Sequence, residues 1–216
     1  MKERPILFSA PMVRALLAGT KTQTRRIIKD QGLVEFDEDG DGELIHHHSP
    51  RCPGYCDYAC DHRCPYGSPG DRLWVRETWY CDHRDCLSGP YVKPPTGEID
   101  LYYRADGEAR TQFEQLDPPD ANIWKPSIHM PRWASRITLE ITDVRVQRLQ
   151  EISEEDAKAE GATLDKDGFP VAQRPLDDGY DCCRDWYADL WDSINGAHSW
   201  DANPWVWALT FKRVPA

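Results

Sequence analysis

Hydrophobic and polar residues alternate along several short segments of this chain, a pattern typical of strands with one buried face. The alternation predicts strands at residues 72–79 and 136–149. Short apolar runs predict an edge strand at residues 6–8 and a last strand at 205–214, and residues 99–104 are a further candidate. Within 136–149 the alternation breaks at Thr142 and Asp143, as a β-bulge would cause.

Three short helices are predicted between these strands from residues that begin and end helices. A side-chain oxygen at the start accepts a backbone N–H, and a glycine suits the turn that ends a helix. The predicted pairs of first and last residues are Ser9 with Gly19, Ser153 with Gly161, and Asp181 with Gly196. The third helix is predicted to bury one face, formed by Trp186, Tyr187, Leu190, Trp191 and Ile194. Dispersed strands with three short helices favour an α+β domain over a βαβ sandwich.

The length and composition fit a single domain over residues 1–216 with one large insertion. The apolar fraction of 40% is enough for a core, while 17 Pro and 14 Gly indicate much loop. Residues 30–70 are acidic, then His-rich, then Cys-rich, and we interpret them as the insertion. Residues 106–125 are polar and interrupted by proline, which predicts a loop.

The charge of the chain excludes one broad function. A net charge of −11 disfavours nonspecific binding along long nucleic acids, because such binding needs a basic face. A small basic cleft on an acidic body remains compatible with this charge. Basic residues do gather in a few segments, namely Lys21, Arg25, Arg26, Lys29, Arg76, Arg132 and Arg136.

No targeting or membrane segment is expected. The N-terminal residues lack the apolar stretch of a signal peptide, and no apolar run reaches the 18 residues that suggest a membrane helix. The expected location is therefore the cytoplasm. In that reducing compartment, cysteines more often serve as metal ligands or buried thiols than as disulfides.

Cys52, Cys56, Cys60 and Cys64 recur at four-residue spacing inside the insertion. Cytosolic cysteines at short spacings favour a structural zinc ion with four protein ligands. The usual spacing is C-x-x-C, so this pattern departs from it, although the Pro53–Gly54 step permits the bends that a tetrahedral site needs. The histidines His46, His47, His48 and His62 are alternative ligands. A loop of free thiols and an iron–sulfur cluster are the other interpretations.

The stretch from Gly19 to Arg26 concentrates an amine, hydroxyls and guanidiniums directly after the first predicted helix. A threonine hydroxyl is a weak nucleophile that needs an adjacent base. Lys21 would supply that base if burial or the neighbouring arginines lowered its pKa. A basic, threonine-rich turn that is simply solvated is the alternative.

This stretch resembles the G-x-K-x-x-T-x-R signature of the ASCH family. Three further segments resemble the family's central strand, Glu-bearing helix and closing strand, and all four occur in order along the chain. They are residues 19–26, 71–79, 154–161 and 203–211. A fifth segment, residues 127–136, is similar to one in the longer, phage-associated branch of that family.

The resemblance implies a PUA-like β-barrel with short flanking helices. In small ASCH enzymes that deacetylate acetylcytidine, a Lys, a Thr and a Glu carry catalysis, and the matching positions here are Lys21, Thr24 and Glu160. The match of Glu160 rests on a looser motif, and a solvated carboxylate at a helix end is its alternative. Those enzymes are also shorter and lack the Cys-rich insertion.

A basic cleft is expected to bind RNA or a nucleotide or nucleoside through Arg26, Trp74, Arg76, Arg132 and Ser135. Trp74 either stacks on a base or belongs to the core. Four functions follow: a binding module, an amidohydrolase acting on an acylated cytidine, a ribonuclease, and a structural or assembly protein of a phage. The oligomeric state is left open.

Overall fold

The computed structural model describes residues 1–29, 31, 64–81, 101–107, 124–171 and 180–214. The chain forms two compact units. Unit 1 contains Met1–Gly19, Gly70–Glu140 and Lys212–Ala216, and unit 2 contains Thr20–Pro69 and Ile141–Phe211. Most of the predicted insertion lies outside the described residues, and a single domain over the whole chain stays a prediction.

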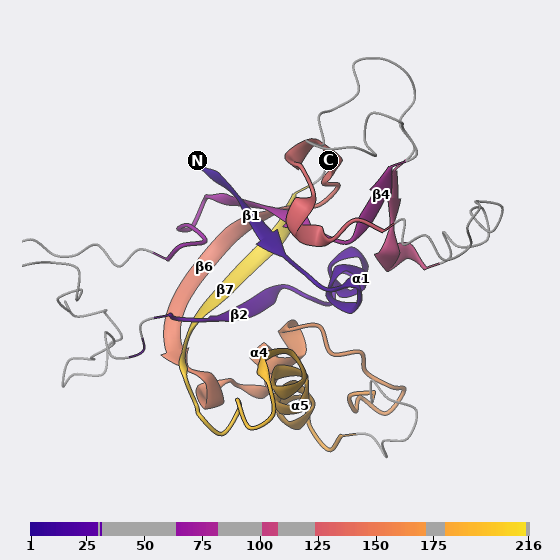
Figure 1. Cartoon of the computed structure of the whole chain (residues 1–216). Coiled ribbons are helices and arrows are strands. Elements are labelled where there is room, and N and C mark those ends of the chain that lie inside the picture. The colour runs from indigo at the N-terminus through magenta and orange to yellow at the C-terminus, as the bar shows by residue number, and fades with distance from the viewer. Residues whose placement is uncertain (30, 32–63, 82–100, 108–123, 172–179, 215–216) are drawn as a thin grey trace, which may run out of the picture. The chain divides into compact units, whose positions relative to one another are not determined.

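Unit 1 is built on three hydrogen-bonded strands in the order β1-β3-β6. Strand β1 (Glu3–Leu7) is parallel to β3 (Arg72–Arg76), and β3 is antiparallel to the first residues of β6 (Thr138–Arg148). A separate antiparallel pair joins β4 (Trp79–Cys81) to β5 (Leu101–Tyr103). The edge position predicted for the first strand is therefore confirmed, because β1 stands at the end of this order (Figure 1).

The helical parts of unit 1 are short. Helix α1 (Ala10–Ala18) ends at Gly19, whose left-handed φ of 77° lets its N–H bond to the Leu16 carbonyl. Ser9 occupies the N-cap position as predicted, but its side chain makes no capping hydrogen bond. The remaining turns are 3-10 helices: η2 (Arg104–Asp106), η3 (Ser127–His129) and η4 (Arg132–Ala134).

Unit 1 buries apolar residues from one face of its strands. Leu73 and Val75 on β3 are fully buried, as is Ile6 on β1. A second cluster gathers around Trp79, which meets Trp133 edge to face with ring centroids 5.8 Å apart. Alternate positions of β3 therefore point away from the core, which leaves Arg72, Trp74 and Arg76 on its other face.

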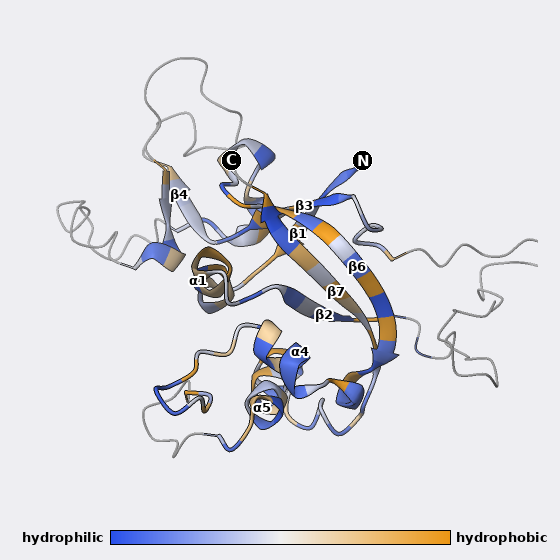
Figure 2. Cartoon of the chain, turned by 180° about the vertical axis from the view of Figure 1, so that it is seen from behind, coloured by the Kyte–Doolittle hydropathy of each residue, from blue (hydrophilic) through white to orange (hydrophobic). Residues whose placement is uncertain are grey.

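Unit 2 has strands in the order β6-β7-β2. Strand β2 (Gln23–Ile27) is antiparallel to β7 (Trp205–Val214). Strand β6 runs unbroken from 138 to 148, and its burial alternates as far as Ile141 before Thr142 and Asp143 are both exposed. Figure 2 shows the alternating hydrophobic and hydrophilic residues along this strand. The bulge proposed at this break stays a prediction.

Two helices of unit 2 pack against each other, and the first also packs against β2. They are α4 (Glu154–Ala159) and α5 (Cys183–Asn195), and the 3-10 turn η5 (Leu149–Glu151) precedes α4. Their shared apolar core includes the buried side chains of Ala157, Cys183, Trp186, Tyr187, Trp191 and Val206. Figure 1 shows the two helices side by side.

The ends of these helices agree in part with the predictions. Ser153 caps α4 as predicted, because its hydroxyl accepts the Asp156 N–H at 3.1 Å, and Gly161 follows with a φ of 107°. The start of α5 was predicted wrongly, since Cys182 rather than Asp181 occupies the N-cap position. Ile194, which was predicted on the same face as Trp186 and Trp191, is 52% exposed.

The mixed sheet with short helices confirms the predicted α+β class. One strand was missed, because residues 23–27 were interpreted as part of a basic turn, whereas they form β2. Pairing with β7 explains this difference: every residue from Gln23 to Ile27 has a partner there. Closure into a PUA-like barrel stays a prediction. Among the described residues, no helix is long and apolar enough to cross a membrane.

Candidate functional site

Lys21 and Glu160, separated by 139 positions in the sequence, form a buried ion pair in unit 2. The Lys21 Nζ lies 2.7 Å from one carboxylate oxygen of Glu160 and 2.8 Å from its backbone carbonyl oxygen. Their backbones also form an isolated antiparallel bridge, and the Thr22 N–H donates to the Ala159 carbonyl. The C-terminal end of α4 is therefore fixed against the residues that lead into β2.

Arg25 provides a second cation for the same carboxylate. Its Nη1 lies 3.2 Å from the other oxygen of Glu160, and its Nη2 lies 2.8 Å from Asp156. Asp156 and Glu160 stand four residues apart on α4, so they face the same side of that helix. Arg25 spans both of them, and its side chain has no exposed surface.

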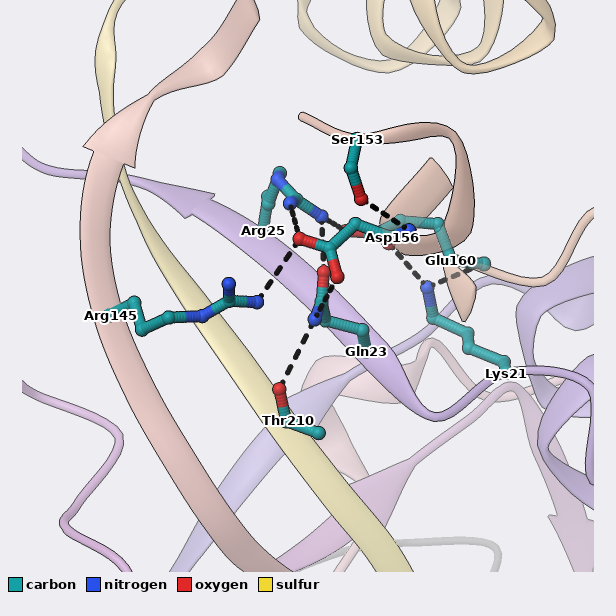
Figure 3. A network of polar contacts seen from close by, with 8 residues as sticks. All are labelled: Lys21, Gln23, Arg25, Arg145, Ser153, Asp156, Glu160 and Thr210. Carbon is teal, nitrogen blue, oxygen red and sulfur yellow. Dashed lines mark hydrogen bonds and ion pairs between the residues drawn. The ribbon is translucent and has the colours of Figure 1, made fainter. Parts of the chain in front are cut away.

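The network extends from Asp156 toward β6 and β7, as Figure 3 shows. Asp156 accepts hydrogen bonds from Gln23 at 3.0 Å and from Arg145 at 3.1 Å. Gln23 also donates to the Thr210 hydroxyl at 3.2 Å. In Figure 3 two carboxylates are surrounded by one lysine and two arginines. Arg145 also pairs with the carboxylate of Asp143 at 3.2 Å, so the cations and carboxylates of this network are equal in number.

Burial decides the electrostatics of this pair. The side chain of Lys21 is 0% exposed and that of Glu160 is 2% exposed. Burial lowers the pKa of the Lys21 ammonium from its ordinary 10.5, and the charges of Arg26 and Arg25 act in the same direction, while Glu160 opposes them. A lysine with a lowered pKa, in contact with a carboxylate, has the groups required for proton transfer.

Tyr187 of α5 completes the surroundings of Glu160. Its hydroxyl is hydrogen-bonded to that carboxylate, and the guanidinium carbon of Arg25 lies 6.0 Å from the centre of its ring. Burial raises the pKa of Tyr187 well above its ordinary value, and the negative charge of Glu160 adds to this effect. Tyr187 therefore remains a protonated donor to Glu160 at neutral pH.

Thr24, the third predicted catalytic residue, is buried on β2 with 2% of its surface exposed. Its position alternates with Gln23 and Arg25, so its side chain projects from the opposite face of the strand. The structure thus brings Lys21 together with Glu160, and it places Thr24 away from the side chains that bind Asp156. Arg26 is partly buried, and its charge acts on Lys21.

The other predicted binding residues lie in unit 1. Trp74 is 8% exposed, and the guanidinium carbons of Arg76 and Arg132 lie 4.7 Å and 6.0 Å from its ring centre. The Ser135 hydroxyl donates to the Val75 carbonyl at 2.8 Å. Trp74, Arg76 and Arg132 are therefore clustered, with the tryptophan ring packed against the two guanidiniums.

Arg136, one of the basic residues noted in the sequence, is occupied by two acidic partners. It holds both oxygens of the buried Glu77, at 2.9 Å and 3.0 Å, and both oxygens of Asp106, each at 2.7 Å. Its guanidinium also lies 3.9 Å from the centre of the Tyr103 ring. Arg136 is therefore paired with carboxylates of unit 1.

Of the four predicted zinc ligands, Cys52, Cys56 and Cys60 lie outside the described residues, and Cys64 is buried. No group of three or more potential metal ligands occurs within the part of the chain that the structure describes. Zinc at the cysteine cluster stays a prediction.

Four residues of the network were not singled out from the sequence as site residues: Gln23, Asp156, Arg145 and Tyr187. Arg25 had been noted only as a basic neighbour of Lys21. A signal was present, because Gln23 and Arg25 are two residues apart on one strand face, and Asp156 and Glu160 are four apart on a helix. The pairing of β2 with α4 could not be read from spacing, since it joins positions more than 130 residues apart.

Comparisons with known proteins add little to this site. No protein-family model and no curated protein matches the chain. The structure is similar to the crystal structure of an ASCH domain from Lactobacillus crispatus, with 10% sequence identity, covering 98% of this chain and 79% of that chain. The TM-score is 0.35, at which the similarity carries no argument. The resemblance of this chain to the ASCH family rests on its sequence motifs alone.

Proposed function

We propose that this chain is an ASCH-type protein that binds a nucleoside, a nucleotide or single-stranded RNA beside Lys21, Thr24 and Arg26. The observation that carries the proposal is the 2.7 Å ion pair between Lys21 and Glu160. Both residues were selected from motifs that lie 139 positions apart in the sequence, and the fold brings them into contact. Lysine and glutamate side chains are seldom fully buried in proteins, so the burial of this pair is unusual.

The chemistry of the network supports a ligand with polar edges or an anionic group. Nucleobases present donors and acceptors along their edges, and nucleotides add a phosphate. Lys21 and Arg26 supply donors and positive charge, and Glu160 supplies an acceptor.

A second candidate function is hydrolysis of an acyl group from a modified cytidine. The lowered pKa of Lys21 favours it, because a neutral amine can accept a proton. In this reaction the Thr24 oxygen would bond to the acyl carbon while its proton passes to Lys21. The C–N bond would then break with proton transfer to the leaving amine, and water would release the acyl group from Thr24. This route requires a rearrangement that brings the Thr24 hydroxyl within hydrogen-bond reach of the Lys21 amine, because Thr24 projects from the face of β2 opposite to Gln23 and Arg25.

The ribonuclease and phage-assembly alternatives have no supporting contact among the described residues. Zinc binding by the cysteine cluster and a cytoplasmic location also remain part of the proposal. Neither is needed for the chemistry of Lys21 and Glu160.

The first experiment measures ligand binding at the Lys21 site. We expect a panel of nucleosides, acylated nucleosides and nucleotides to contain at least one compound that raises the melting temperature of the protein, with calorimetry confirming its affinity. Lys21→Ala should abolish that binding. Lys158→Ala is the matched control, because Lys158 is an exposed lysine on α4. A full panel without binding, or equal binding by both variants, would reject a nucleoside site at Lys21.

A further inference from the structure

Arg72, Trp74 and Arg76 form a row on one face of β3 in unit 1. Alternate residues of a strand share a face, and the buried Leu73 and Val75 occupy the opposite one. The row spans about 13 Å, at roughly 3.3 Å per residue. It is therefore a linear arrangement of two cationic groups around one aromatic ring.

Neighbouring strands extend this face. On β1, the register places Glu3 beside Arg72 and Leu7 beside Arg76. On β6, it places Thr138 beside Trp74 and Glu140 beside Arg72. Leu7 is 42% exposed, and Ile128, near the same arginine, is 56% exposed. The face is thus partly open and combines cationic, aromatic and aliphatic groups.

Two guanidinium groups lie over the ring of Trp74. Arg76 lies over its ring at 4.7 Å and Arg132 at 6.0 Å, both within cation–π range. Arg132 reaches Glu3 at 3.1 Å and the Thr138 hydroxyl at 3.3 Å, and 44% of its side chain is exposed. The tryptophan thereby restricts the guanidinium groups, which reduces the entropy lost when they bind a ligand.

Arg72 and Arg76 form no ion pair with any described residue, although the chain carries 37 acidic residues against 26 basic ones. The Nε atom of each is buried and has no hydrogen-bond partner in the described part of the chain. Arg76 donates from Nη1 to the Ile128 carbonyl at 3.2 Å. Among the described residues no carboxylate pairs with Arg76, and Glu3 and Glu140 lie beside Arg72 in the register while their ion pairs go to Arg132 and Lys212. Guanidinium groups placed in this way are suited to an anionic ligand.

We propose that the row of Arg72, Trp74 and Arg76, together with Arg132, is a second binding surface, which holds a single-stranded nucleic acid. The arginines bind phosphates, and the outer planes of Arg76 and Arg132 accept stacked bases. Arginine planes stack bases readily when the bases are unpaired. A duplex is disfavoured, because its bases are already stacked and its charge density requires a larger basic surface than this acidic chain offers.

This surface goes beyond the proposed nucleoside site and does not depend on it. The nucleoside site uses Lys21 and Glu160 of unit 2, whereas the row belongs wholly to unit 1. A free nucleoside lacks the phosphates that Arg72 and Arg76 would bind. A free nucleoside therefore tests the Lys21 site alone, and variants in each site show which of them binds RNA.

The test measures fluorescence anisotropy of a labelled single-stranded RNA of about ten nucleotides, within the range of single-strand sites. Wild-type protein should bind at low salt, and Arg72→Gln/Arg76→Gln should raise the Kd at least about tenfold, as expected for losing one or more charge-assisted hydrogen bonds. The slope of log K against log salt should fall by about 1.4, or 0.7 for each lost phosphate contact.

The matched control is Arg4→Gln. Arg4 lies in the same unit, and its replacement removes one positive charge, half of that removed by the double variant. Its position alternates with Glu3 and Pro5, and it pairs with Asp71. It should leave the Kd within about twofold of wild type, and equal thermal melting of all variants excludes unfolding as the cause. Arg76→Lys should keep the salt slope but weaken binding, since an ammonium does not stack. The proposal is overturned if wild-type protein does not bind the RNA, if the double variant binds equally, or if Arg4→Gln is as damaging.

Lys21→Ala distinguishes the two proposals. RNA binding that survives in Lys21→Ala, combined with loss in the double variant, supports the unit 1 surface even if no nucleoside binds. Loss of RNA binding in Lys21→Ala alone, at a temperature where circular dichroism shows that this variant is folded, would assign the RNA to the Lys21 site and reject the surface on β3.

Discussion

Glu154 in the first turn of α4 accepts the backbone N–H of Cys183, the first residue of α5. The same carboxylate accepts the Arg184 N–H at 3.1 Å. Two of the N–H groups that a helix start leaves without internal partners are thus satisfied by a side chain from another helix. The contact also places a negative charge at the positive end of the α5 dipole.

The first prediction concerns this cap. Glu154→Ala should lower the free energy of unfolding by about 1 kcal/mol, which is typical of a lost N-cap interaction. Chemical denaturation followed by circular dichroism measures the change. Glu155→Ala is the matched control, because Glu155 is an exposed glutamate in the same turn of α4. Equal loss in both variants would show that the cap contributes nothing specific.

The pH dependence of this cap follows from the pKa of Glu154. Burial alone would raise that pKa, but the hydrogen bonds from Cys183 and Arg184 outweigh it and hold the pKa below the ordinary 4.5. A carboxylate with a depressed pKa stabilises the fold above its unfolded value and loses this effect as the pH falls through the folded value. The difference between wild type and Glu154→Ala should therefore be constant from pH 7 to about pH 5 and then shrink in acid.

Features encoded by neighbouring residues could be predicted from the sequence. The bounds of β7, the Ser153 cap and the Gly19 stop all follow from short segments, and the structure reproduces each of them. The start of α5 could not be found in this way. Its cap comes from Glu154, 29 residues earlier, so the nearest acidic residue, Asp181, was the wrong choice.

In the candidate site too, residues that lie in local motifs could be predicted, and contacts between distant segments could not. Lys21 and Glu160 were both selected, because each lies in a motif, and the structure places them in contact. Strand β2 and the contact between Arg25 and Asp156 were missed, because each depends on partners that folding alone brings close. In the sequence, the polar side chains of β2 look like those of a solvated turn. Only the structure shows that they face the helix α4.

The second prediction concerns the energy of the buried ion pair. Lys21→Met should lower the free energy of unfolding by roughly 3–5 kcal/mol, because it leaves the Glu160 carboxylate buried beside a single remaining cation. Lys21→Met/Glu160→Gln should be less destabilised than the sum of the single variants, since the unmatched charge is then removed. Lys158→Met, on an exposed lysine of α4, should change stability by less than about 0.5 kcal/mol. Additive losses would mean that the two side chains do not interact energetically.

The third prediction concerns zinc. Four cysteines at regular spacing predict about one zinc ion per chain, the stoichiometry of one closed four-ligand site. Metal analysis of protein purified without an affinity tag that binds metal measures this content. Replacing Cys52 and Cys56 by serine should abolish the bound zinc. The far-ultraviolet circular dichroism of the protein should stay nearly unchanged, because β2, α4 and α5 remain folded. Protein free of both zinc and iron would reject a metal site in the insertion.

The fourth prediction concerns catalysis on an acylated cytidine, measured by chromatographic detection of cytidine. Lys21→Ala and Thr24→Ala should each remove nearly all turnover, and their effects should not add, because a base and the nucleophile it activates act as one unit. Glu160→Gln should lower kcat roughly 100- to 10,000-fold, as for a lost acid–base group. The rate should rise with pH through the lowered pKa of Lys21, since only the neutral amine accepts the Thr24 proton.

Folding must be separated from chemistry in this experiment, because the network that holds Lys21 also joins β2 to α4. Tyr187→Phe serves this purpose: it keeps the ring beside Arg25 and removes only the hydroxyl bound to Glu160, so it should slow turnover while the protein stays folded. Tyr103→Phe removes a comparable hydroxyl that donates to the Ala134 carbonyl in unit 1, and it should leave turnover unchanged. Full activity in Lys21→Ala would contradict its role as the base. A wild-type protein that binds nucleosides but hydrolyses none of their acyl derivatives would leave binding as the function of this site.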